Sequence, residues 1–319
     1  MNPYNTEMPN KYRIFLPTGN YDMVICTLIH QGPDMVNYMV KNLSRYIRGK
    51  FLFIIHYNSE EPLDENTLPE WCWIVRDPIV TKHTNISLSL ALNRCIKFAL
   101  QNIKFVNCML ISSGCVFIKE YICPNEPKVC GTCHYYAFPH QRDAQVHMYP
   151  IPTIALGNIE GYFKNVLVTP NRRAQWDTTN MIDGGWIYPS FDKHTELHTI
   201  LRKRNIKYVK GCQLSGQVFP YEVARTVNED LELIHTDEQI SKYNYSLEEI
   251  IFSTYSYDYS IRKGMVNEYT TIATDWDNFY DVIRIEQIYK AQRDNKNAYG
   301  LCKVPYDMNH PMRVFLMNV

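Results

Sequence analysis

The sequence lacks both a net charge and an apolar run long enough to cross a bilayer. Lys plus Arg and Asp plus Glu both total 33 over the 319 residues. A neutral chain has no general electrostatic attraction for nucleic acid or for an anionic membrane, so neither is expected as the main partner. No window approaches the roughly 20 consecutive apolar residues of a transmembrane helix. The first residues have neither a basic region nor an apolar core, which predicts that there is no signal peptide.

The common nucleotide-binding motifs are also missing. There is no G-x-x-x-x-G-K-[ST] phosphate loop, and no G-x-G-x-x-G follows the first predicted strand. The fourth predicted strand ends in Ser112-Ser-Gly-Cys-Val-Phe117, without an Asp-x-Asp motif to bind a divalent cation. Asp275-Trp-Asp277 lies far downstream and just before a predicted helix, where acidic residues favour the helix N-terminus. We therefore expect no metal ion in the functional site.

The composition is that of an ordinary folded protein. Hydrophobic residues make up 45% of the chain and charged residues 21%, which argues against disorder. No stretch has the composition of a linker, a repeat or a low-complexity tract, so residues 1–319 are expected to form a single domain. The ten cysteines are scattered, and several lie inside apolar runs, where a thiol acts as a small hydrophobe. Without a secretory signal, we expect reduced thiols and a cytoplasmic location, in the host cytoplasm if the source is viral.

Strands and helices alternate in the first half of the chain. Continuous apolar runs predict buried strands at 23–29, 51–55, 73–75 and 106–111. Helical spacing of apolar residues predicts helices at 34–48 and 87–101. This alternation indicates an α/β fold of Rossmann type, with a mostly parallel sheet and helices on both faces. In such folds ligands bind beyond the carboxyl ends of the strands.

The second half gives weaker signals. Residues 120–183 are rich in Pro, His and Tyr, and we expect loops, short strands and much of the acceptor surface there. Helices are predicted at 191–205, from Glu248 onwards and at 276–293, followed by a strand-like tail.

Two predicted strands end on a histidine. His30 follows the first strand, and His56 ends the second, with Asn58 two residues later. One histidine at a strand end is more often structural than functional. Two in the same relative position of a doubly wound sheet indicate a shared crevice. We interpret His30 and His56 as lining it, with Asn58 able to bond a nucleobase or a ribose.

A group of cysteines could form a metal site, although no metal ion is expected in the functional site. Cys130 and Cys133 form a C-x-x-C that is followed by His134, and Cys123 lies nearby. A structural zinc site usually combines two such pairs, and the chain has no second C-x-x-C. We favour ordinary loop cysteines, although a compact site of three cysteines and one histidine stays open.

The segment from Ser246 to Thr254 has two competing interpretations. As a capping box, Ser246 would cap a helix and Glu249 would reach back to the Ser246 N–H. As a catalytic base, Glu249 would deprotonate a hydroxyl nucleophile in a cleft. The local pattern favours the capping box, because S-x-x-E before an apolar run is common.

Six basic residues near the C-terminus are candidates for neutralising a diphosphate in a site without metal. Most of them are expected to be solvated surface charges. Lys303 differs, because it lies within the apolar, strand-like Tyr299–Pro305 segment. The six are Arg262, Lys263, Lys290, Arg293, Lys303 and Arg313.

Taken together, these segments resemble the core-2/I-branching glycosyltransferase family, which includes peptide O-xylosyltransferases and has a GT-A-type fold. The family's first strand ends in a histidine, and a second strand ends in His-x-Asp. His56-Tyr57-Asn58 is similar to the latter, with asparagine in place of aspartate. The family's small-residue helix start resembles Thr84–Ala91.

Three further segments carry the resemblance. Leu-Ser-Gly-x-Asp-x-Pro resembles Ile111–Ile118, which contains Ser113 and Gly114 but departs at Val116 and Ile118. Gly-Ser-x-Trp resembles Gly184-Gly185-Trp186 loosely, because the spacing is one residue shorter. Asp-Glu followed five residues later by Thr is the best match, and it corresponds to Glu248, Glu249 and Thr254.

The resemblance implies a function and assigns roles. It divides the domain into a nucleotide-binding half at about 20–120 and an acceptor and catalytic half at about 121–319. It implies metal-independent, inverting transfer of a sugar, GlcNAc or xylose being favoured, from a UDP-sugar to a glycan hydroxyl, with no cofactor. Glu249 would be the base, and the diphosphate would bind Lys303 and, in addition, Arg262 or Arg313. His30, His56 and Asn58 would bind the nucleotide. The sugar and acceptor would contact Ser113, Gly114, Gly185, Trp186 and Glu248.

Two other functions compete with this one. The departures at Asn58, Val116 and Ile118 are those expected of a protein that binds a nucleotide or a glycan without turnover. A Rossmann-like methyltransferase fits less well, because the early Gly-rich turn is missing.

Overall fold

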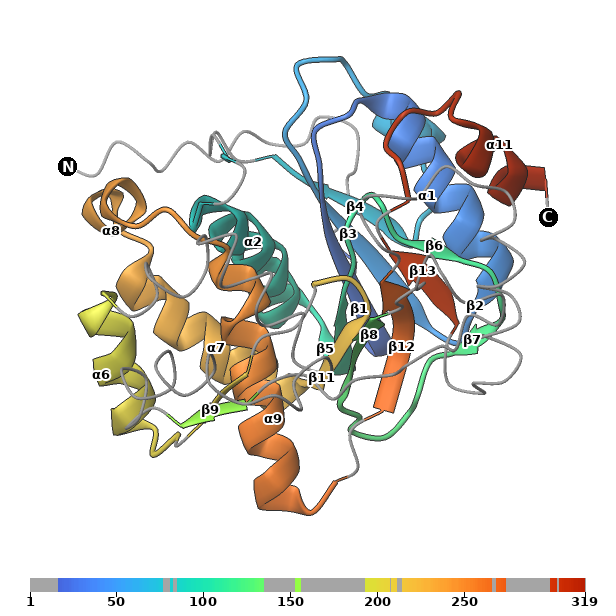
Figure 1. The fold of residues 1–319 in the computed structure, drawn as a ribbon. Helices are drawn as coiled ribbons and strands as arrows, with labels where there is room; N and C mark the ends of the chain where they lie inside the picture. Colours follow the sequence, from blue (N-terminus) through green and yellow to red (C-terminus); the bar gives the residue numbers. More distant parts are fainter. Residues whose placement is uncertain are drawn as a thin grey trace, which may run out of the picture.

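A nine-stranded mixed sheet forms the centre of the computed structural model, which describes residues 17–76, 81–82, 85–134, 153–155, 193–206, 208–210, 214–265, 268–273, 299–302 and 304–318. The strand order is β4-β3-β1-β5-β11-β8-β12-β13-β6 (Figure 1). The strands are β1 Asn20–Ile29, β3 Phe51–Tyr57, β4 Cys72–Val75, β5 Lys104–Leu110, β6 Val116–Phe117, β8 Cys130–His134, β11 Gln217–Pro220, β12 Glu268–Ala273 and β13 Gly300–Cys302. Short pairs join β2 Ile47–Arg48 to β7 Tyr121–Ile122 and β9 Thr153–Ala155 to β10 Tyr208–Lys210.

The parallel part of the sheet consists of β1, β3, β4 and β5. β1 pairs with β3 on one side and with β5 on the other, and β4 extends the sheet beyond β3. All four are apolar along most of their length because both faces of the sheet are covered. The predicted α/β architecture, with a parallel sheet in the first half, is therefore confirmed.

The remaining strands make the sheet mixed. β11 runs antiparallel between β5 and β8, and β12 and β13 are parallel to β8. β8, β12 and β13 consequently run in the same direction as β1, β3 and β5. Their carboxyl ends all lie along one edge, which we call the carboxyl edge of the sheet.

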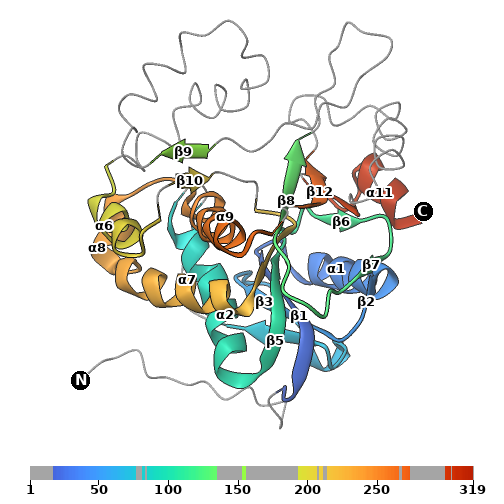
Figure 2. The ribbon, with the colours of Figure 1, turned by 90° about the horizontal axis from the view of Figure 1, so that it is seen from below.

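Helices cover both faces of the sheet. α2 (Ser87–Asn102), α7 (Tyr221–Ile234) and α9 (Ile251–Lys263) pack on one face, while α1 (Pro33–Tyr46) and α11 (Pro311–Asn318) pack on the other (Figures 1 and 2). Each face has its own core of buried side chains. The short helices are α6 Thr195–Lys203, α8 Asp237–Lys242, and the 3-10 turns η1 Glu65–Thr67 and η4 Leu247–Glu249.

Two predictions for the second half were wrong or incomplete. The tail was expected to be strand-like, yet only Gly300–Cys302 is a strand, and Pro311–Asn318 forms helix α11. Helix α7 was not predicted, although its buried residues Val223, Val227 and Leu231 recur at helical spacing. The helix predicted at 276–293 lies outside the described residues.

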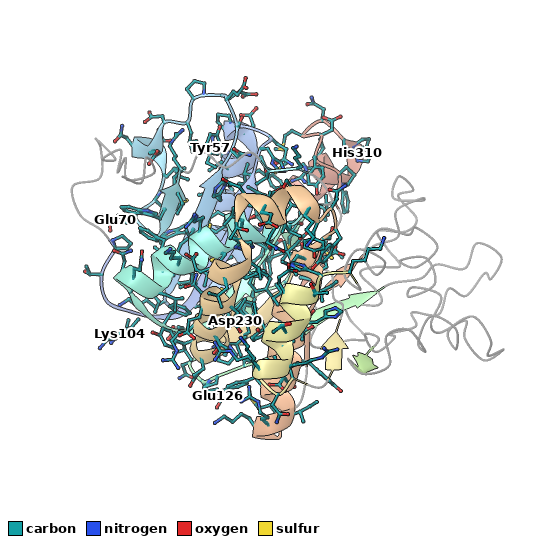
Figure 3. All side chains as sticks on the ribbon, turned by 90° about the vertical axis from the view of Figure 1, so that its left-hand side faces the viewer. Tyr57, Glu70, Lys104, Glu126, Asp230 and His310 are labelled. Atoms are coloured by element: carbon teal, nitrogen blue, oxygen red, sulfur yellow. The ribbon has the colours of Figure 1, made fainter. Side chains whose placement is uncertain are left out.

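Figure 3 shows the two edges of the sheet. Tyr57, the last residue of β3, lies toward one end of the molecule, as does His310. Lys104, the first residue of β5, lies toward the opposite end, as does Glu126. No helix in the described part of the chain combines the length and the apolar character needed to cross a membrane.

Candidate functional site

The strand order places a topological switch point between β1 and β5. β1 leads through α1 to β3, whereas β5 lies on the other side of β1 and follows α2. α1, which follows β1, and α2, which precedes β5, cover opposite faces of the sheet, so the connections of these two neighbouring strands lie on opposite sides. Open α/β sheets bind their ligands at such a switch point, outside the carboxyl ends of the strands.

His56 lies at this edge and is completely enclosed. Its side chain is on the same face as Leu52 and Ile54 and so faces helix α2. Neither ring nitrogen has a hydrogen-bond partner among the described residues. Burial and the nearby Arg94 guanidinium lower the His56 pKa to about 4, so the ring is neutral at pH 7. A neutral imidazole offers one donor and one acceptor to a group from outside the described residues.

The other two predicted nucleotide contacts lie at the ends of neighbouring strands. His30 directly follows β1 and is exposed. Asn58 follows β3 and is half-buried, and its backbone N–H donates to the Ile29 carbonyl at 2.9 Å. The Asn58 side chain donates to the Thr81 hydroxyl at 3.0 Å. The structure thus brings His30, His56 and Asn58 to one edge, as the sequence predicts.

Two serine hydroxyls meet directly after β5, the strand that pairs with β1. The Ser112 N–H donates to Ser215 Oγ at 3.0 Å, and the two serine hydroxyl oxygens are 2.6 Å apart. Gly114 packs tightly, because a Cβ there would lie 3.1 Å from the Val304 carbonyl oxygen. Ser113 is buried. Ser113 and Gly114 are therefore placed at the carboxyl edge.

The capping box predicted at Ser246 does not form. Ser246 precedes the 3-10 turn η4 and makes no side-chain capping hydrogen bond, and the bond that joins the two ends of the turn runs from the Glu249 N–H to the Ser246 carbonyl. Helix α9 begins only at Ile251. The chain turns too tightly through Leu247–Glu249 for an α-helical first turn, so the reciprocal side-chain bonds of a capping box are not made.

Glu248 and Glu249 are two adjacent acidic residues that are both buried, with 5% and 6% of their surface exposed. Glu and Asp are rarely buried unless their charge is compensated. η4 packs against α2 and is joined to α9, whose Phe252 ring stacks on Phe219 of β11 at 5.7 Å. Glu249 is therefore held by packed elements on the α2 face of the sheet.

Asn85 ties the start of α2 to the segment before η4. Its side-chain nitrogen lies 3.3 Å from three acceptors, the carbonyl oxygens of Ile240 and Tyr243 and Asn244 Oδ1. Because α2 follows β4, its N-terminus lies at the carboxyl edge, and so does the chain that Asn85 bonds. The two acidic residues of η4 follow within five residues of Asn244.

A second histidine joins the same region. His235, directly after α7, places Nε2 at 2.9 Å from the Ser89 hydroxyl in the first turn of α2. Burial and the charge of Arg94 lower its pKa to about 3. Four residues of this region were not predicted from the sequence, because no local motif marks them: Asn85, Arg94, Ser215 and His235. Only the packing of α2 brings Asn85, Arg94 and His235 together.

Arg313 has partners that account for most of its donors. It is completely buried, and Nε donates to the Pro305 carbonyl at 2.6 Å and Nη2 to the Ser113 carbonyl at 3.3 Å. Its guanidinium carbon lies 4.5 Å from the centre of the Tyr38 ring. Arg313 therefore supports the Ser113 turn from behind, and its predicted contact with a diphosphate stays a prediction.

Arg262 is not brought to the carboxyl edge. It lies near the end of α9, roughly 16 Å along the helix from Ile251, and the strand that follows starts at the opposite edge. Its Nε donates to Asp258 Oδ2 at 2.7 Å, one helical turn away. The direction of α9 thus separates Arg262 from Glu249.

Three predicted site residues, Lys303, Gly185 and Trp186, lie outside the described residues. The C-x-x-C was expected in a loop, but it lies in strand β8, because residues 130–134 pair with β12. The side chains of Cys133 and His134 are likewise outside the described part. Cys123 and Cys130 are buried free thiols, and burial raises the pKa of each to about 12. Within the described residues, no group of three or more potential ligands is arranged to hold a metal ion.

The N-terminus of α1 is occupied by a carboxylate of the protein itself. A Cβ on Gly32, the residue before the helix, would lie 2.7 Å from Glu61 Oε2. Pro33 follows as the first helical residue and has no N–H to donate. In many Rossmann-type proteins this helix end binds a phosphate group. Here the Glu61 carboxylate beside Gly32 would repel such a group.

Two cavities outlined by described residues lie elsewhere. One of about 550 Å³ lies between α1 and α11, and one of about 680 Å³ lies at the opposite edge, between the start of β1 and the end of α2. None of the predicted site residues lines either cavity. The candidate site is therefore identified from its side chains and from the order of the strands, and not from either of these cavities.

Comparison with known proteins adds no assignment, since no protein-family model and no curated protein matches the chain.

Proposed function

We propose that the protein is a metal-independent, inverting glycosyltransferase of GT-A type that moves a sugar, GlcNAc or xylose being favoured, from a UDP-sugar to a glycan hydroxyl in the cytoplasm. The observation that carries the proposal is the pair of buried acids Glu248 and Glu249 next to the start of α2. The turn that carries them packs beside a sheet whose order β4-β3-β1-β5 is similar to the strand order found in doubly wound nucleotide-binding folds, which supports the proposal.

In the proposed reaction Glu249 acts as the general base. Its carboxylate takes the proton of the acceptor hydroxyl as the acceptor oxygen attacks the anomeric carbon. The bond from that carbon to the UDP oxygen breaks, and its electron pair leaves with the diphosphate. A single displacement of this kind inverts the anomeric configuration. A positioned base of this kind typically contributes ~10²–10⁴-fold in rate.

The remaining residues bind and orient in this proposal. Asn58 turns its half-buried amide toward the nucleotide, while the enclosed His56 supports the end of β3 from inside the protein. Lys303 supplies the charge that stabilises the departing diphosphate. This division is supported by the Glu61 carboxylate beside Gly32 at the N-terminus of α1, because its negative charge would repel a phosphate there.

The test compares Glu249→Gln with Glu222→Gln, an exposed glutamate in the first turn of α7. UDP release and sugar transfer are measured with UDP-GlcNAc, UDP-xylose and UDP-glucuronic acid, with and without EDTA. Glu249→Gln should lower kcat by ~10²–10⁴-fold with UDP binding retained, whereas Glu222→Gln and EDTA should change little.

Two results would decide against the proposal. Wild-type rates in Glu249→Gln would exclude its role as the base. UDP-sugar binding by the wild type without hydrolysis or transfer from any donor would instead support a nucleotide- or glycan-binding protein without turnover. The melting temperature of each variant, measured alongside, separates loss of chemistry from loss of fold.

A further inference from the structure

A cavity lies at the edge of the sheet opposite the carboxyl edge, between the start of β1 and the end of α2. Its volume is about 680 Å³, which is within the range of small-molecule sites, ~300–1,000 Å³. Lys104, one of its lining residues, lies at the end of the molecule away from Tyr57 and His310 (Figure 3). The cavity is therefore separate from the region around Glu249.

Open backbone acceptors belong to the lining of this cavity. α2 ends at Asn102, and the N–H of Ile103 returns to the Ala99 carbonyl at 3.0 Å. The carbonyl oxygens of Leu100, Gln101 and Asn102, the last three residues of the helix, accept no hydrogen bond from a described residue. The last turn of α2 also has no basic side chain to offset the negative end of the helix dipole. These carbonyls are available to a ligand that carries hydroxyl donors.

Hydrogen-bond donors line the same cavity. Asn20, Gln101 and Lys104 are exposed lining residues. Within the described part of the chain, none of their three side chains forms a hydrogen bond or an ion pair. Each amide offers two N–H donors and one acceptor oxygen, and the lysine ammonium group offers three donors. The cavity thus presents donors and acceptors together, and a hydroxyl group can bond to both because it donates and accepts.

An aromatic ring completes the lining. Tyr221, the first residue of α7, is half-buried, and its ring centre lies 5.1 Å from that of Phe105 in an edge-to-face arrangement. This contact restrains the Tyr221 ring, so a ligand that packs on it causes little further loss of side-chain freedom. A saturated ring that carries several hydroxyl groups suits this lining. Its C–H groups pack on the tyrosine, and its hydroxyl groups bond to the amides and carbonyls.

From this arrangement we propose that the cavity between the start of β1 and the end of α2 binds a neutral pyranose sugar. The sugar hydroxyls donate to the carbonyls at the end of α2 and accept from Asn20, Gln101 and Lys104, while a C–H face of the ring packs on Tyr221. The ligand is neutral because the open carbonyls would repel a phosphate or a carboxylate. Binding here does not depend on the proposed transfer reaction, since it uses none of the residues proposed for that reaction.

The experiment is a titration of the full ¹⁵N-labelled chain, followed through its backbone-amide NMR signals. The ligands are the methyl pyranosides of glucose, galactose, xylose and N-acetylglucosamine. Cyclohexanol is the control ligand, because it has the same ring size and a single hydroxyl. At least one pyranoside should bind saturably in the millimolar range and shift the amides at the start of β1 and the end of α2. Cyclohexanol should bind at least about tenfold more weakly.

Two variants test the lining. Asn20→Ala/Gln101→Ala removes two exposed amides and should weaken sugar binding by at least about tenfold. The matched control, Asn37→Ala/Asn309→Ala, removes two exposed amides elsewhere and should bind the sugar as the wild type does. Tyr221→Ala should weaken binding by about tenfold. Its melting temperature, measured alongside, shows whether the ring also supports the fold.

Three results would overturn the proposal. The first is the absence of saturable shifts with all four pyranosides. The second is shifts confined to the carboxyl edge, at amides such as those of His30 and Gly114, which would place the sugar at the proposed transfer site alone. The third is equal affinity of the wild type and the Asn20/Gln101 variant, or of the pyranoside and cyclohexanol, which would exclude recognition of the hydroxyls. The two substituted amides are exposed, so this variant is expected to fold even if Tyr221→Ala does not.

Discussion

Replacing Tyr255 by Phe should lower the free energy of unfolding by about 2 kcal/mol, because it removes one hydroxyl from a buried three-residue network. The network centres on Asp230 of α7, which is 4% exposed. Arg204, at the end of α6, donates Nε to Oδ2 at 3.0 Å and Nη2 to Oδ1 at 2.9 Å. Tyr255 of α9 donates its hydroxyl to Oδ2. The network therefore joins three helices on the α2 face of the sheet.

The magnitude follows from what each substitution leaves behind. Tyr255→Phe keeps the ring packing and removes one donor to a charged acceptor, a bond that contributes about 1.5–3 kcal/mol. Asp230→Asn removes the charge that two partners share. A broken buried ion pair costs about 3–5 kcal/mol. We expect the lower end, about 3 kcal/mol, because the Arg204 side chain is 40% exposed and water can solvate it.

The assay is urea unfolding followed by circular dichroism. With an m-value of about 3 kcal/mol/M, Tyr255→Phe should lower the midpoint by about 0.7 M. Tyr259→Phe is the matched control on the same helix, since its hydroxyl makes no hydrogen bond to a described residue, and it should stay within about 0.5 kcal/mol. Equal midpoints for Tyr255→Phe and Tyr259→Phe would refute the argument. In that case the network would be replaced by water without loss.

Two further predictions concern pH and glycine. Burial lowers the pKa of His56 and of His194 to about 4, against about 6.5 unfolded, so the unfolded state binds more protons between these values. The free energy of unfolding should fall as the pH drops from 7 to 4, by up to about 3 kcal/mol per histidine. Equal urea midpoints at pH 7.5 and pH 5.0 would contradict this prediction. Gly216→Ala should destabilise by more than about 3 kcal/mol, because φ is +87° and the new Cβ would lie 2.4 Å from the Thr271 hydroxyl oxygen. Gly264→Ala, at φ +62° with no atom within 4 Å, should cost only about 1–2 kcal/mol, and thermal melting of both variants measures the difference.

The parallel half of the fold was predictable because burial on both faces leaves a clear signal. A strand with no solvated face reads as a continuous apolar run, as 23–29 and 51–55 do. Once such strands are parallel, the residues after them share an edge. This is why the sequence alone is enough to place His30 and Asn58 together.

The second half was less predictable because its elements are short and its signals are mixed. Helix α7 carries the helical period but was missed among weaker signals, and α11 was expected to be a strand. The Ser246 pattern predicted a capping box, and a 3-10 turn formed instead. A local motif indicates which hydrogen bonds the side chains could make. The surrounding packing determines whether the backbone adopts a conformation in which they form.

The sequence by itself determined the fold class, the carboxyl edge and the presence of an acidic pair before α9, since these depend on hydrophobic period and chain order alone. Only the tertiary structure decided which charges meet there. α9 runs away from that edge and carries Arg262 with it, while Arg313 is buried against Tyr38 and the Ser113 carbonyl. The physical reason is that a charge acts over a few ångströms, and distances between segments far apart in the chain are set by packing.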